Sequence, residues 1–292
     1  LFMSEIEIHT LVCKKHVRLA SAYLPTLLRH SQKQVRLILH DDGSISRPEA
    51  QFLIEKLPGA QFMRRDHADA QMERRLHDFP ALRQFRRENV FGLKLLDIAL
   101  LADEAAPIVY CDADVWFFRP FRDIFALPPG AGALFMWDYD HSVCVRSWQL
   151  LGGKIALAKH INAGFFTVAR EAFDLPLLER FVADVPSARP YFTEQTGWAL
   201  LAQHADAHLW SRTQVALMNR RTQFSPELVV AHVVKPFRWR FPEIRAQNEA
   251  FDYSALDLPR FETTPVQKLS AGELLKQEFA RIGGKIHRKW GR

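Results

Sequence analysis

Two aspartates stand between two apolar segments of this sequence. Asp112 and Asp114 follow the apolar run 107–111 and precede the aromatic-rich run 115–118. On extended backbone, side chains two residues apart point the same way, so these carboxylates can hold a hard divalent cation together with phosphate oxygens. Two acids flanked by apolar residues would be costly to bury without such a cation. We therefore predict a Mg2+ or Mn2+ site at Asp112 and Asp114.

Further acidic residues occupy comparable positions. Asp138 and Asp140 follow the apolar run 132–137, and we expect them to contact sugar hydroxyls rather than a metal. Asp42 lies in the polar turn that ends the apolar run 35–40. Polar residues at the ends of apolar segments are candidates for ligand binding, because ligands of open parallel sheets bind at the carboxyl ends of the strands.

A histidine and a lysine follow a late apolar segment. His232 ends the run 227–232, and Lys235 comes three residues later. Neutral imidazole is a common metal ligand, and a lysine ammonium binds phosphate. The position favours His232 as a third metal ligand beside a phosphate-binding lysine; the alternative is an ordinary polar residue that serves no ligand.

An alternation of strands and helices would bring these residues together. It runs to about residue 235 and predicts one α/β domain over 1–250 with a mixed, mostly parallel central sheet. Residues 251–292 would form a C-terminal helical extension with a basic tail. We expect strands within 5–13, 35–44, 107–121, 132–140, 160–170 and 227–239, helices within 16–31, 89–106, 193–205 and 271–282, and a helix with a short strand within 47–63.

Composition excludes several classes of protein. The 292 residues are 48% hydrophobic and 25% charged, which is ordinary for a folded domain and excludes disordered, collagen-like and coiled-coil chains. No segment is long and apolar enough to span a membrane, and no secretory signal is recognisable. Three cysteines without CxxC spacing fit a reducing compartment better than a disulfide framework or a cysteine-ligated zinc site. We expect a cytoplasmic protein.

The net charge of +6 indicates an anionic partner: nucleic acid, a phosphorylated small molecule or a membrane face. Part of the charge lies in 64–88, which forms either a solvated helix face with salt bridges or a mobile basic cover over an anionic ligand. The arginines of this segment are Arg64, Arg65, Arg74, Arg75, Arg83, Arg86 and Arg87. The C-terminal tail is either a solvated end or a contact with an anionic membrane. Its basic residues are Arg281, Lys285, Arg288, Lys289 and Arg292.

The ordered set of these segments resembles the GT-A glycosyltransferases, and within them the family 8 retaining enzymes that include lipopolysaccharide galactosyltransferases and glycogenin. The resemblance spans residues 6–239 and rests on the order and spacing of HTLVC, LHDDGSIS, GLKLLDIALL, PIVYCDADVWFF, WDYD, INAGFFTV, TEQTGWALL and HVVKPFRW. It implies a Rossmann-like GT-A domain. The implied activity is metal-dependent transfer of a hexose from a nucleotide diphosphate sugar, with UDP as the expected nucleotide, to a glycan or lipid-linked acceptor in polysaccharide or lipopolysaccharide assembly.

The resemblance also implies roles for individual residues. Asp112, Asp114 and His232 match the residues that bind Mn2+ or Mg2+. The turn around Asp42 resembles one that touches the nucleotide in the inverting family 2 enzymes. The implied donor-binding residues are Thr10, Leu11, Asp42, Lys94, Asp112, Ala113, Asn162 and Lys235. The implied catalytic residues are Gln195, Glu194 and Asp138.

The stereochemical outcome stays open at this point. If the product retains configuration, Gln195, Glu194 or Asp138 would face the oxocarbenium-like anomeric carbon. If it inverts, Asp138 or Asp140 would take the proton from the acceptor hydroxyl as a general base. Gln195 has a second interpretation as an ordinary residue of a helix N-terminus after Thr193.

Other classes of protein make different demands on the sequence. A nucleotidyltransferase would show a glycine-rich phosphate loop after the first strand, where HTLVCKKH has no glycine. A nucleic-acid-binding protein would interleave basic residues with exposed aromatics on one face, so we expect no nucleic-acid partner. A non-catalytic anion-binding protein would have no need of Asp112, Asp114 and His232 together. The expected partners are a nucleotide-sugar, a glycan or lipid-linked acceptor, and an anionic membrane at its cytoplasmic face.

Overall fold

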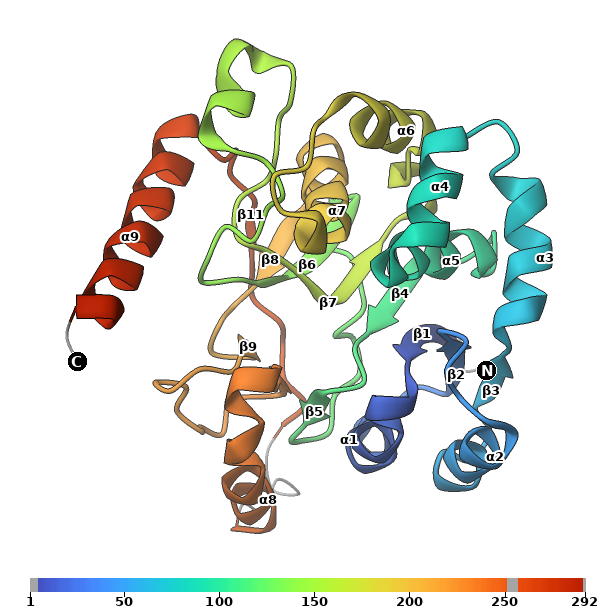
Figure 1. Ribbon diagram of the computed structural model, residues 1–292. Coiled ribbons are helices and arrows are strands. Elements are labelled where there is room, and N and C mark those ends of the chain that lie inside the picture. The colour runs from blue at the N-terminus through green and yellow to red at the C-terminus, as the bar shows by residue number, and fades with distance from the viewer. Residues whose placement is uncertain (1–4, 251–256, 291–292) are drawn as a thin grey trace.

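The computed structural model describes residues 5–250 and 257–290, with side chains described up to residue 247 and from 257 to 282. It contains an eight-stranded sheet in the order β11-β8-β6-β7-β4-β1-β2-β3 and a three-stranded sheet in the order β5-β10-β9 (Figure 1). The strands are β1 (Ile6–Val12), β2 (Val35–Asp41), β3 (Gln61–Met63), β4 (Ile108–Cys111), β5 (Val115–Phe117), β6 (Ala133–Trp137), β7 (Ile161–Val168), β8 (His208–Trp210), β9 (Val215–Leu217), β10 (Val230–His232) and β11 (Thr263–Pro265). The α-helices are α1 (Val17–His30), α2 (Arg47–Lys56), α3 (Arg65–Arg75), α4 (Pro80–Glu88), α5 (Val90–Leu101), α6 (Leu175–Asp184), α7 (Thr193–His204), α8 (Phe241–Ala250) and α9 (Ala271–Trp290).

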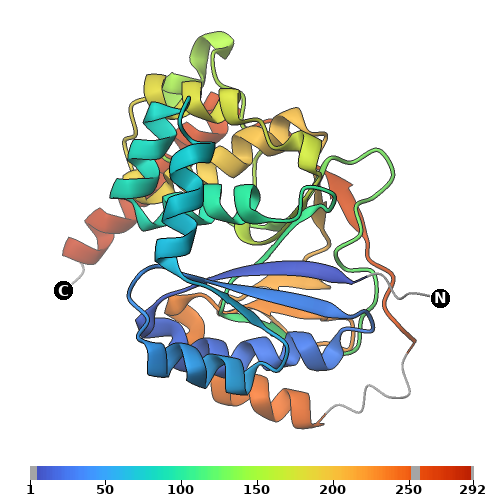
Figure 2. The same ribbon diagram turned by 90° about the vertical axis from the view of Figure 1, so that its right-hand side faces the viewer.

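The large sheet is mixed, as the sequence predicts. Strands β1, β2, β3 and β4 run parallel to one another, while β7 lies antiparallel between β4 and β6. The parallel strands are apolar along most of their length, because helices cover both faces of the sheet (Figure 2). The carboxyl ends of β1, β2 and β4 therefore meet at one edge, where polar side chains remain accessible.

Two hydrophobic cores flank this sheet. Ile8 and Val12 of β1 point to the side of α1 and α2, where they pack with Leu24 and Leu27. On the other side, Tyr110 of β4 packs in a second core, to which α5 and α7 contribute buried residues. α1 is amphipathic, and its apolar face packs in the first core. α2 begins with a capping box, in which Ser46 and Glu49 form hydrogen bonds with each other's backbone N–H groups.

The small sheet continues the chain beyond β4. β5 follows β4 after a three-residue loop and pairs antiparallel with β10, and β9 lies parallel to β10 on its other side. His232 stands opposite Val115 in this ladder, and the Val233 N–H donates to the Asp114 carbonyl over 2.8 Å. This pairing holds the end of β10 against the loop that carries the two aspartates.

The arginine-rich segment 64–88 forms α3 and α4, and most of its arginines are ion-paired. Arg86 is buried and forms a bidentate contact with Asp97 of α5 over 2.6 and 2.7 Å. The other pairs are Arg64 with Asp41, Arg65 with Asp69, Arg75 with Glu104, and Arg83 with Glu73. The salt-bridged helix face is thus the interpretation that the structure supports, rather than the mobile basic cover.

The last part of the chain packs against the large sheet and its core. β11 pairs with β8 at the edge of the large sheet, and Leu269 and Leu274 are buried in the same core as α5 and α7. α9 is longer than the predicted 271–282. Among the described residues, no helix has the length and apolar character needed to span a membrane. Of the basic tail, Arg281 is described in full, whereas the side chains of Lys285, Arg288 and Lys289, and the whole of Arg292, lie outside the described residues.

Several elements were not expected from the sequence. β8, β9 and β11 have three residues each, so they are too short to show the period-two alternation that identifies strands. α6 and α8 also lie in stretches for which no element was predicted. None of these additions changes where the predicted strands end.

Candidate active site

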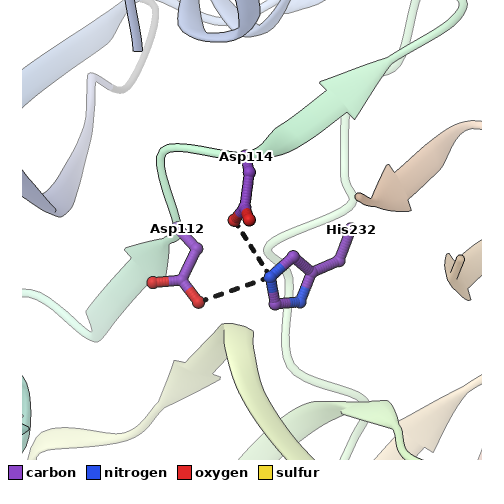
Figure 3. Close-up of side chains that lie close together, drawn as sticks. All are labelled: Asp112, Asp114 and His232. Atoms are coloured by element: carbon purple, nitrogen blue, oxygen red, sulfur yellow. Dashed lines mark ion pairs between the residues drawn. The ribbon is translucent and has the colours of Figure 1, made fainter. Parts of the chain in front are cut away.

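Three side chains with metal-binding atoms converge beside the end of β4. Asp112 and Asp114 come from the loop between β4 and β5, and His232 reaches them from the end of β10 (Figure 3). One ligand atom of each residue lies within 4.8 Å of the others. His232 and Asp114 are buried, and Asp112 is partly exposed, so the cluster faces solvent on the side of Asp112.

The orientation of His232 is set by Asn162 of β7. The Gly164 N–H donates to Asn162 Oδ1 over 3.0 Å, and the same oxygen lies 3.2 Å from His232 Nδ1. Because an amide oxygen only accepts, Nδ1 must carry a hydrogen, and Nε2 is left facing Asp114 Oδ1 at 3.0 Å and Asp112 Oδ2 at 3.5 Å. Nε2 and the two carboxylates can share either a proton on the imidazole or a metal cation between them, and carboxylate oxygens with a neutral imidazole suit a divalent ion such as Mn2+.

The charges around His232 also favour a cation at this site. Burial lowers the pKa of His232, but the nearby Asp114 and Asp112 carboxylates outweigh it and raise that pKa above its usual value. Asp114 shows the reciprocal effect, since His232 and Arg238 overcome its burial and hold its pKa well below the usual range. A site that attracts a proton to the imidazole attracts a metal cation for the same electrostatic reason.

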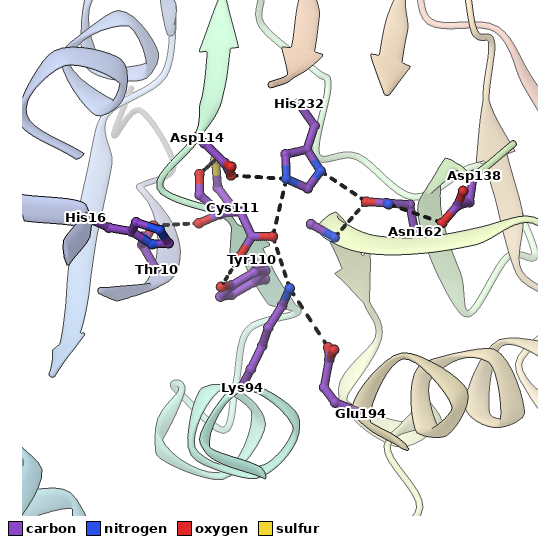
Figure 4. A network of polar contacts seen from close by, with 12 residues as sticks. Thr10, His16, Lys94, Tyr110, Cys111, Asp114, Asp138, Asn162, Glu194 and His232 are labelled. Atoms are coloured by element: carbon purple, nitrogen blue, oxygen red, sulfur yellow. Dashed lines mark hydrogen bonds and ion pairs between the residues drawn. The ribbon is translucent and has the colours of Figure 1, made fainter. Parts of the chain in front are cut away.

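Lys94 of α5 provides a buried positive charge next to Asp112. Its Nζ lies 3.1 Å from Asp112 Oδ2 and 3.9 Å from Glu194 Oε1 of α7 (Figure 4). Burial lowers the pKa of Lys94, but the Asp112 and Glu194 carboxylates raise it by more. The pKa therefore lies above its usual value, and the ammonium stays charged. Tyr110 donates its hydroxyl to Asp112 Oδ1 over 2.5 Å. The position of the Asp112 carboxylate is therefore fixed by two donors.

Glu194 has an unusual protonation behaviour. Burial raises its pKa to about 7, even though Lys94 lowers it. At neutral pH this carboxyl is balanced between its neutral and charged forms, so the charge of the Lys94–Glu194 pair changes in the physiological range. Glu194 contacts Lys94, and Figure 4 shows it on the other side of the ammonium from Asp114 and His232 of the metal-binding cluster.

Asp138 lies on the other side of Asn162. Its Oδ2 accepts from Gln195 Nε2 at 3.3 Å and from Asn162 Nδ2 at 3.5 Å, and its Oδ1 accepts from the Asp140 N–H at 3.0 Å. Burial raises the pKa of Asp138, partly offset by these hydrogen bonds. Asn162 thus joins Asp138 to His232, and Figure 4 shows this row of side chains across the site.

An arginine completes the cluster on the opposite side. Arg238, in the 3-10 helix η5 (Lys235–Arg240), donates from Nη2 to Asp114 Oδ2 over 2.8 Å and lies 3.4 Å from His16 Nε2. Burial lowers the pKa of His16, and the charge of Arg238 lowers it further. His16 is therefore a neutral acceptor, and Arg238 is a cation at the edge of the metal-binding cluster.

Comparison with known proteins identifies the fold. No model of a known protein family matches the sequence, and the sequence has no significant match among curated proteins. Solved structures do match. Mouse xyloside xylosyltransferase 1 superposes with a TM-score of 0.58 at 12% identity over 80% of this chain and 99% of its own. The galactosyltransferase LgtC, crystallised with donor and acceptor sugar analogues, gives 0.53 at 10% identity over 87% and 98%, and GlyE of Streptococcus pneumoniae gives 0.55 at 11% identity over 86% and 61%. The chain has the GT-A glycosyltransferase fold.

Within the GT-A fold, most of the residues predicted from the sequence come together. Asp112, Asp114 and His232 form the metal-binding cluster, with Ala113 buried between the aspartates. The residues that surround this cluster in one network are Lys94, Asn162, Asp138, Gln195 and Glu194.

Four predicted donor-binding residues lie differently from the others. Thr10 is fully buried and donates its hydroxyl to the Cys111 carbonyl over 2.7 Å, while Leu11 packs against the core. Asp42 Oδ1 accepts from the N–H and the hydroxyl of Ser44 and so stabilises the turn after β2. Lys235 is exposed at the first residue of η5.

Two residues of the site were missed by the sequence analysis. Tyr110 stands two positions before Asp112, so strand alternation places both on the same side, which was a usable signal. Arg238 stands three positions after Lys235, one turn further along η5, and only the conformation of that turn decides which of the two cations reaches Asp114.

Proposed function

We propose that this protein is a metal-dependent glycosyltransferase. It transfers a hexose from a nucleotide diphosphate sugar, with UDP as the nucleotide, to a glycan or lipid-linked acceptor, and the product retains the anomeric configuration. The observation that carries the proposal is the cluster of Asp112, Asp114 and His232, oriented by Asn162, at the carboxyl end of β4 in a GT-A fold.

The chain's own charges support departure of a diphosphate. A divalent cation held by Asp112, Asp114 and His232 would neutralise the negative charge that develops on the leaving group. Lys94 contacts Asp112, and Arg238 contacts Asp114. Their positive charges fix both carboxylates in place and add to the electrostatic attraction for the diphosphate oxygens.

Retention is favoured by the hydrogen bonds of Asp138. Both of its oxygens already accept from the protein, so the carboxylate is poorly placed to take a proton from an acceptor hydroxyl. Because Gln195 donates from Nε2 to Asp138, its Oε1 remains as the lone-pair group that can face the anomeric carbon. In the reaction we propose, the acceptor hydroxyl forms the new C–O bond, the C–O bond to the diphosphate breaks, and the hydroxyl proton leaves on the diphosphate.

The first test is a titration of UDP, with GDP, CMP and ADP as comparators. Each nucleotide is added to the protein with Mn2+ and then with EDTA, using the wild type and Asp114→Ala. We expect UDP to bind only with the metal and to lose binding in the variant. Absence of nucleotide binding under every condition would overturn the catalytic proposal in favour of a binding protein on the same fold.

The stereochemistry has its own test. Once a sugar is transferred or the donor is hydrolysed slowly, NMR of the first product formed shows its anomeric configuration. We expect the configuration of the donor. Inversion would instead assign the role of general base to Asp138 or Asp140.

Helix α9 has an exposed apolar face that could contact a membrane carrying a lipid-linked acceptor. Leu275, Phe279 and Ile282 are 44%, 64% and 54% exposed and recur at helical spacing on α9. Arg281 lies directly before Ile282, and Lys285, Arg288, Lys289 and Arg292 follow. An exposed apolar stripe with adjacent basic residues suits an anionic membrane surface, to which each basic residue adds about 1 kcal/mol. We propose that α9 brings the enzyme to the cytoplasmic face of a membrane for polysaccharide or lipopolysaccharide assembly.

This part is tested by co-sedimentation with anionic and neutral vesicles. The full chain should bind the anionic vesicles, and a chain that ends at Ala280 should bind less. Equal binding by both chains would show that the C-terminal segment makes no such contact.

A further inference from the structure

We propose that the acceptor carries an anionic group, a phosphate or a carboxylate, and that Arg212, Arg220 and Arg221 bind it. This inference rests on the proposed function and specifies the chemical class of the acceptor. It concerns a part of the molecule that neither the metal-binding cluster nor the membrane contact uses.

The three arginines line two adjoining cavities next to the proposed sugar site. The larger cavity, of about 600 Å³, is lined by Arg212 and Arg221, and the smaller, of about 410 Å³, by Arg220 and Arg221. Tyr139 lines both. Because Tyr139 directly follows Asp138, the cavities begin where the transferred sugar would be held.

The arginines of the cavities differ from the cations that contact the metal-binding cluster. Lys94, Arg238 and His232 surround the two aspartates at which the donor phosphates would lie. The arginines of the cavities come instead from the segments before and after β9, and they line the cavities together with Tyr139. A molecule in these cavities would therefore lie beside Tyr139, the residue that follows Asp138 at the proposed sugar site.

The guanidinium groups of these arginines have no ion-pair partner among the described residues. Arg220 and Arg221 form no ion pair or side-chain hydrogen bond with any described residue, and Arg212 lies 4.8 Å above the Trp137 ring as its stabilising contact. The arginines of α3 and α4 behave differently, since most of them pair with a carboxylate. Exposed cations that gather around a cavity without partners are available to a ligand.

The loop that carries two of the arginines is held in place. Arg240 is buried and donates from Nη1 to the carbonyls of Asn219 and Thr222 over 2.7 and 3.0 Å. The Asn219 N–H donates to Thr222 Oγ1, and the Arg221 N–H donates to Asn219 Oδ1. The backbone at Arg220 and Arg221 is thus fixed from both sides, which lowers the entropy that a ligand must overcome.

The chemistry of the lining selects an anion. Glu227 is the carboxylate among the residues that line the larger cavity, and the smaller cavity has none in its lining. Guanidinium groups bind phosphate and carboxylate through paired N–H donors. The exposed Tyr139 and the partly exposed Phe237 add aromatic surface on which a sugar ring can pack. Together these features fit a sugar that bears a negative charge, and that group takes no part in the transfer itself, because a hydroxyl of the acceptor attacks.

The experiment compares sugars that differ in charge. Glucose, glucose 6-phosphate and glucuronic acid serve as probes, and their affinities are measured at fixed ionic strength with Mn2+ and saturating UDP. The variant is Arg220→Gln/Arg221→Gln. The matched control is Arg47→Gln/Arg87→Gln, which removes the same charge from exposed positions on α2 and α4.

For the wild type we expect the charged probes to bind about tenfold more tightly than glucose. The Arg220/Arg221 variant should lose this preference while the control keeps it, and UDP should bind both variants as it binds the wild type. Equal affinity of the wild type for all three sugars would overturn the proposal, as would an equal loss in the control. A loss of UDP affinity in the Arg220/Arg221 variant would assign these arginines to the donor. Failure of the wild type to bind UDP at all would instead contradict the proposed function.

Discussion

The amide oxygen of Asn162 lies 3.2 Å from Nδ1 of His232, and this contact decides which ring nitrogen faces the two aspartates. The Gly164 N–H fixes the oxygen in turn, so neither the amide nor the imidazole can rotate without losing a hydrogen bond. Asn162 is therefore a positioning residue for the metal-binding cluster, although it contributes no ligand atom to it.

Replacing Asn162 by alanine should weaken metal binding. Without the acceptor at Nδ1, the hydrogen can move to Nε2 and block the nitrogen that faces Asp114. We expect a loss of about 10- to 100-fold in Mn2+ affinity, measured by calorimetry. Gln84→Ala, on an exposed face of α4, is the matched control and should bind Mn2+ as the wild type does. Unchanged affinity in Asn162→Ala would mean that another contact orients the imidazole.

Gly164 should tolerate no side chain. A Cβ at this position would lie 2.2 Å from Cε1 and 2.3 Å from Nδ1 of His232, so the imidazole would have to move. Gly164→Ala should abolish metal-dependent UDP binding and lower the free energy of unfolding by about 1 to 3 kcal/mol. Gly272→Ala has open space around its Cβ, so it should leave UDP binding unchanged. Because alanine is the better helix former, it should not lower the free energy of unfolding. Retained UDP binding in Gly164→Ala would contradict the assigned role of His232.

Glu194 should make stability depend on pH. Its pKa is about 7 in the folded protein against an ordinary value of 4.5, so the folded state holds a proton that the unfolded state releases. As the pH rises from about 4.5 to 7, the contribution of Glu194 to the free energy of unfolding should therefore fall by roughly 3 kcal/mol. Glu194→Gln should remove this dependence, as measured by urea unfolding with EDTA present. Identical pH profiles for wild type and variant would show that the carboxyl ionises normally.

The buried pair of Arg86 and Asp97 should be important for stability. Removal of one partner leaves a buried charge without compensation, which costs about 3 to 5 kcal/mol. We expect Arg86→Ala to lower the free energy of unfolding by this amount, while Arg87→Ala, on the exposed side of the same helix, should change it by less than about 0.5 kcal/mol. Similar effects of the two substitutions would contradict a specific role for the buried pair.

The sequence carries enough information to locate the centre of the site. Asp112, Asp114 and Asp138 follow β4 and β6, two strands of the large sheet whose carboxyl ends lie at one edge. His232 ends β10 of the small sheet, and the pairing of β10 with β5 brings it to the two aspartates. The order of the segments adds Lys94 and Asn162 through the resemblance to GT-A enzymes. The order of the strands in the sheet determines which of these residues become neighbours. Both the hydrophobic pattern and the resemblance to GT-A enzymes indicate that order, so the residues of the network could be predicted.

What the sequence conceals depends on contacts between distant segments. The arginines of 64–88 look like a free basic surface, yet several have partners in distant segments. Arg64 pairs with Asp41 of β2, Arg75 with Glu104, and Arg86 with Asp97 of α5. Thr10 looks polar and available, but strand alternation turns its hydroxyl to the Cys111 carbonyl. A pattern of residue types cannot show which of these groups is already satisfied.

The antiparallel pairing of β5 with β10 also has a consequence for how the protein is made. On a ribosome, both aspartates emerge well before the strand that ends in His232, so a nascent chain arrested before residue 230 carries two ligands and no third. The return of β10 is a long-range contact, and such contacts form late and slowly. The growing chain thus carries all three metal-binding side chains only after β10 has been made.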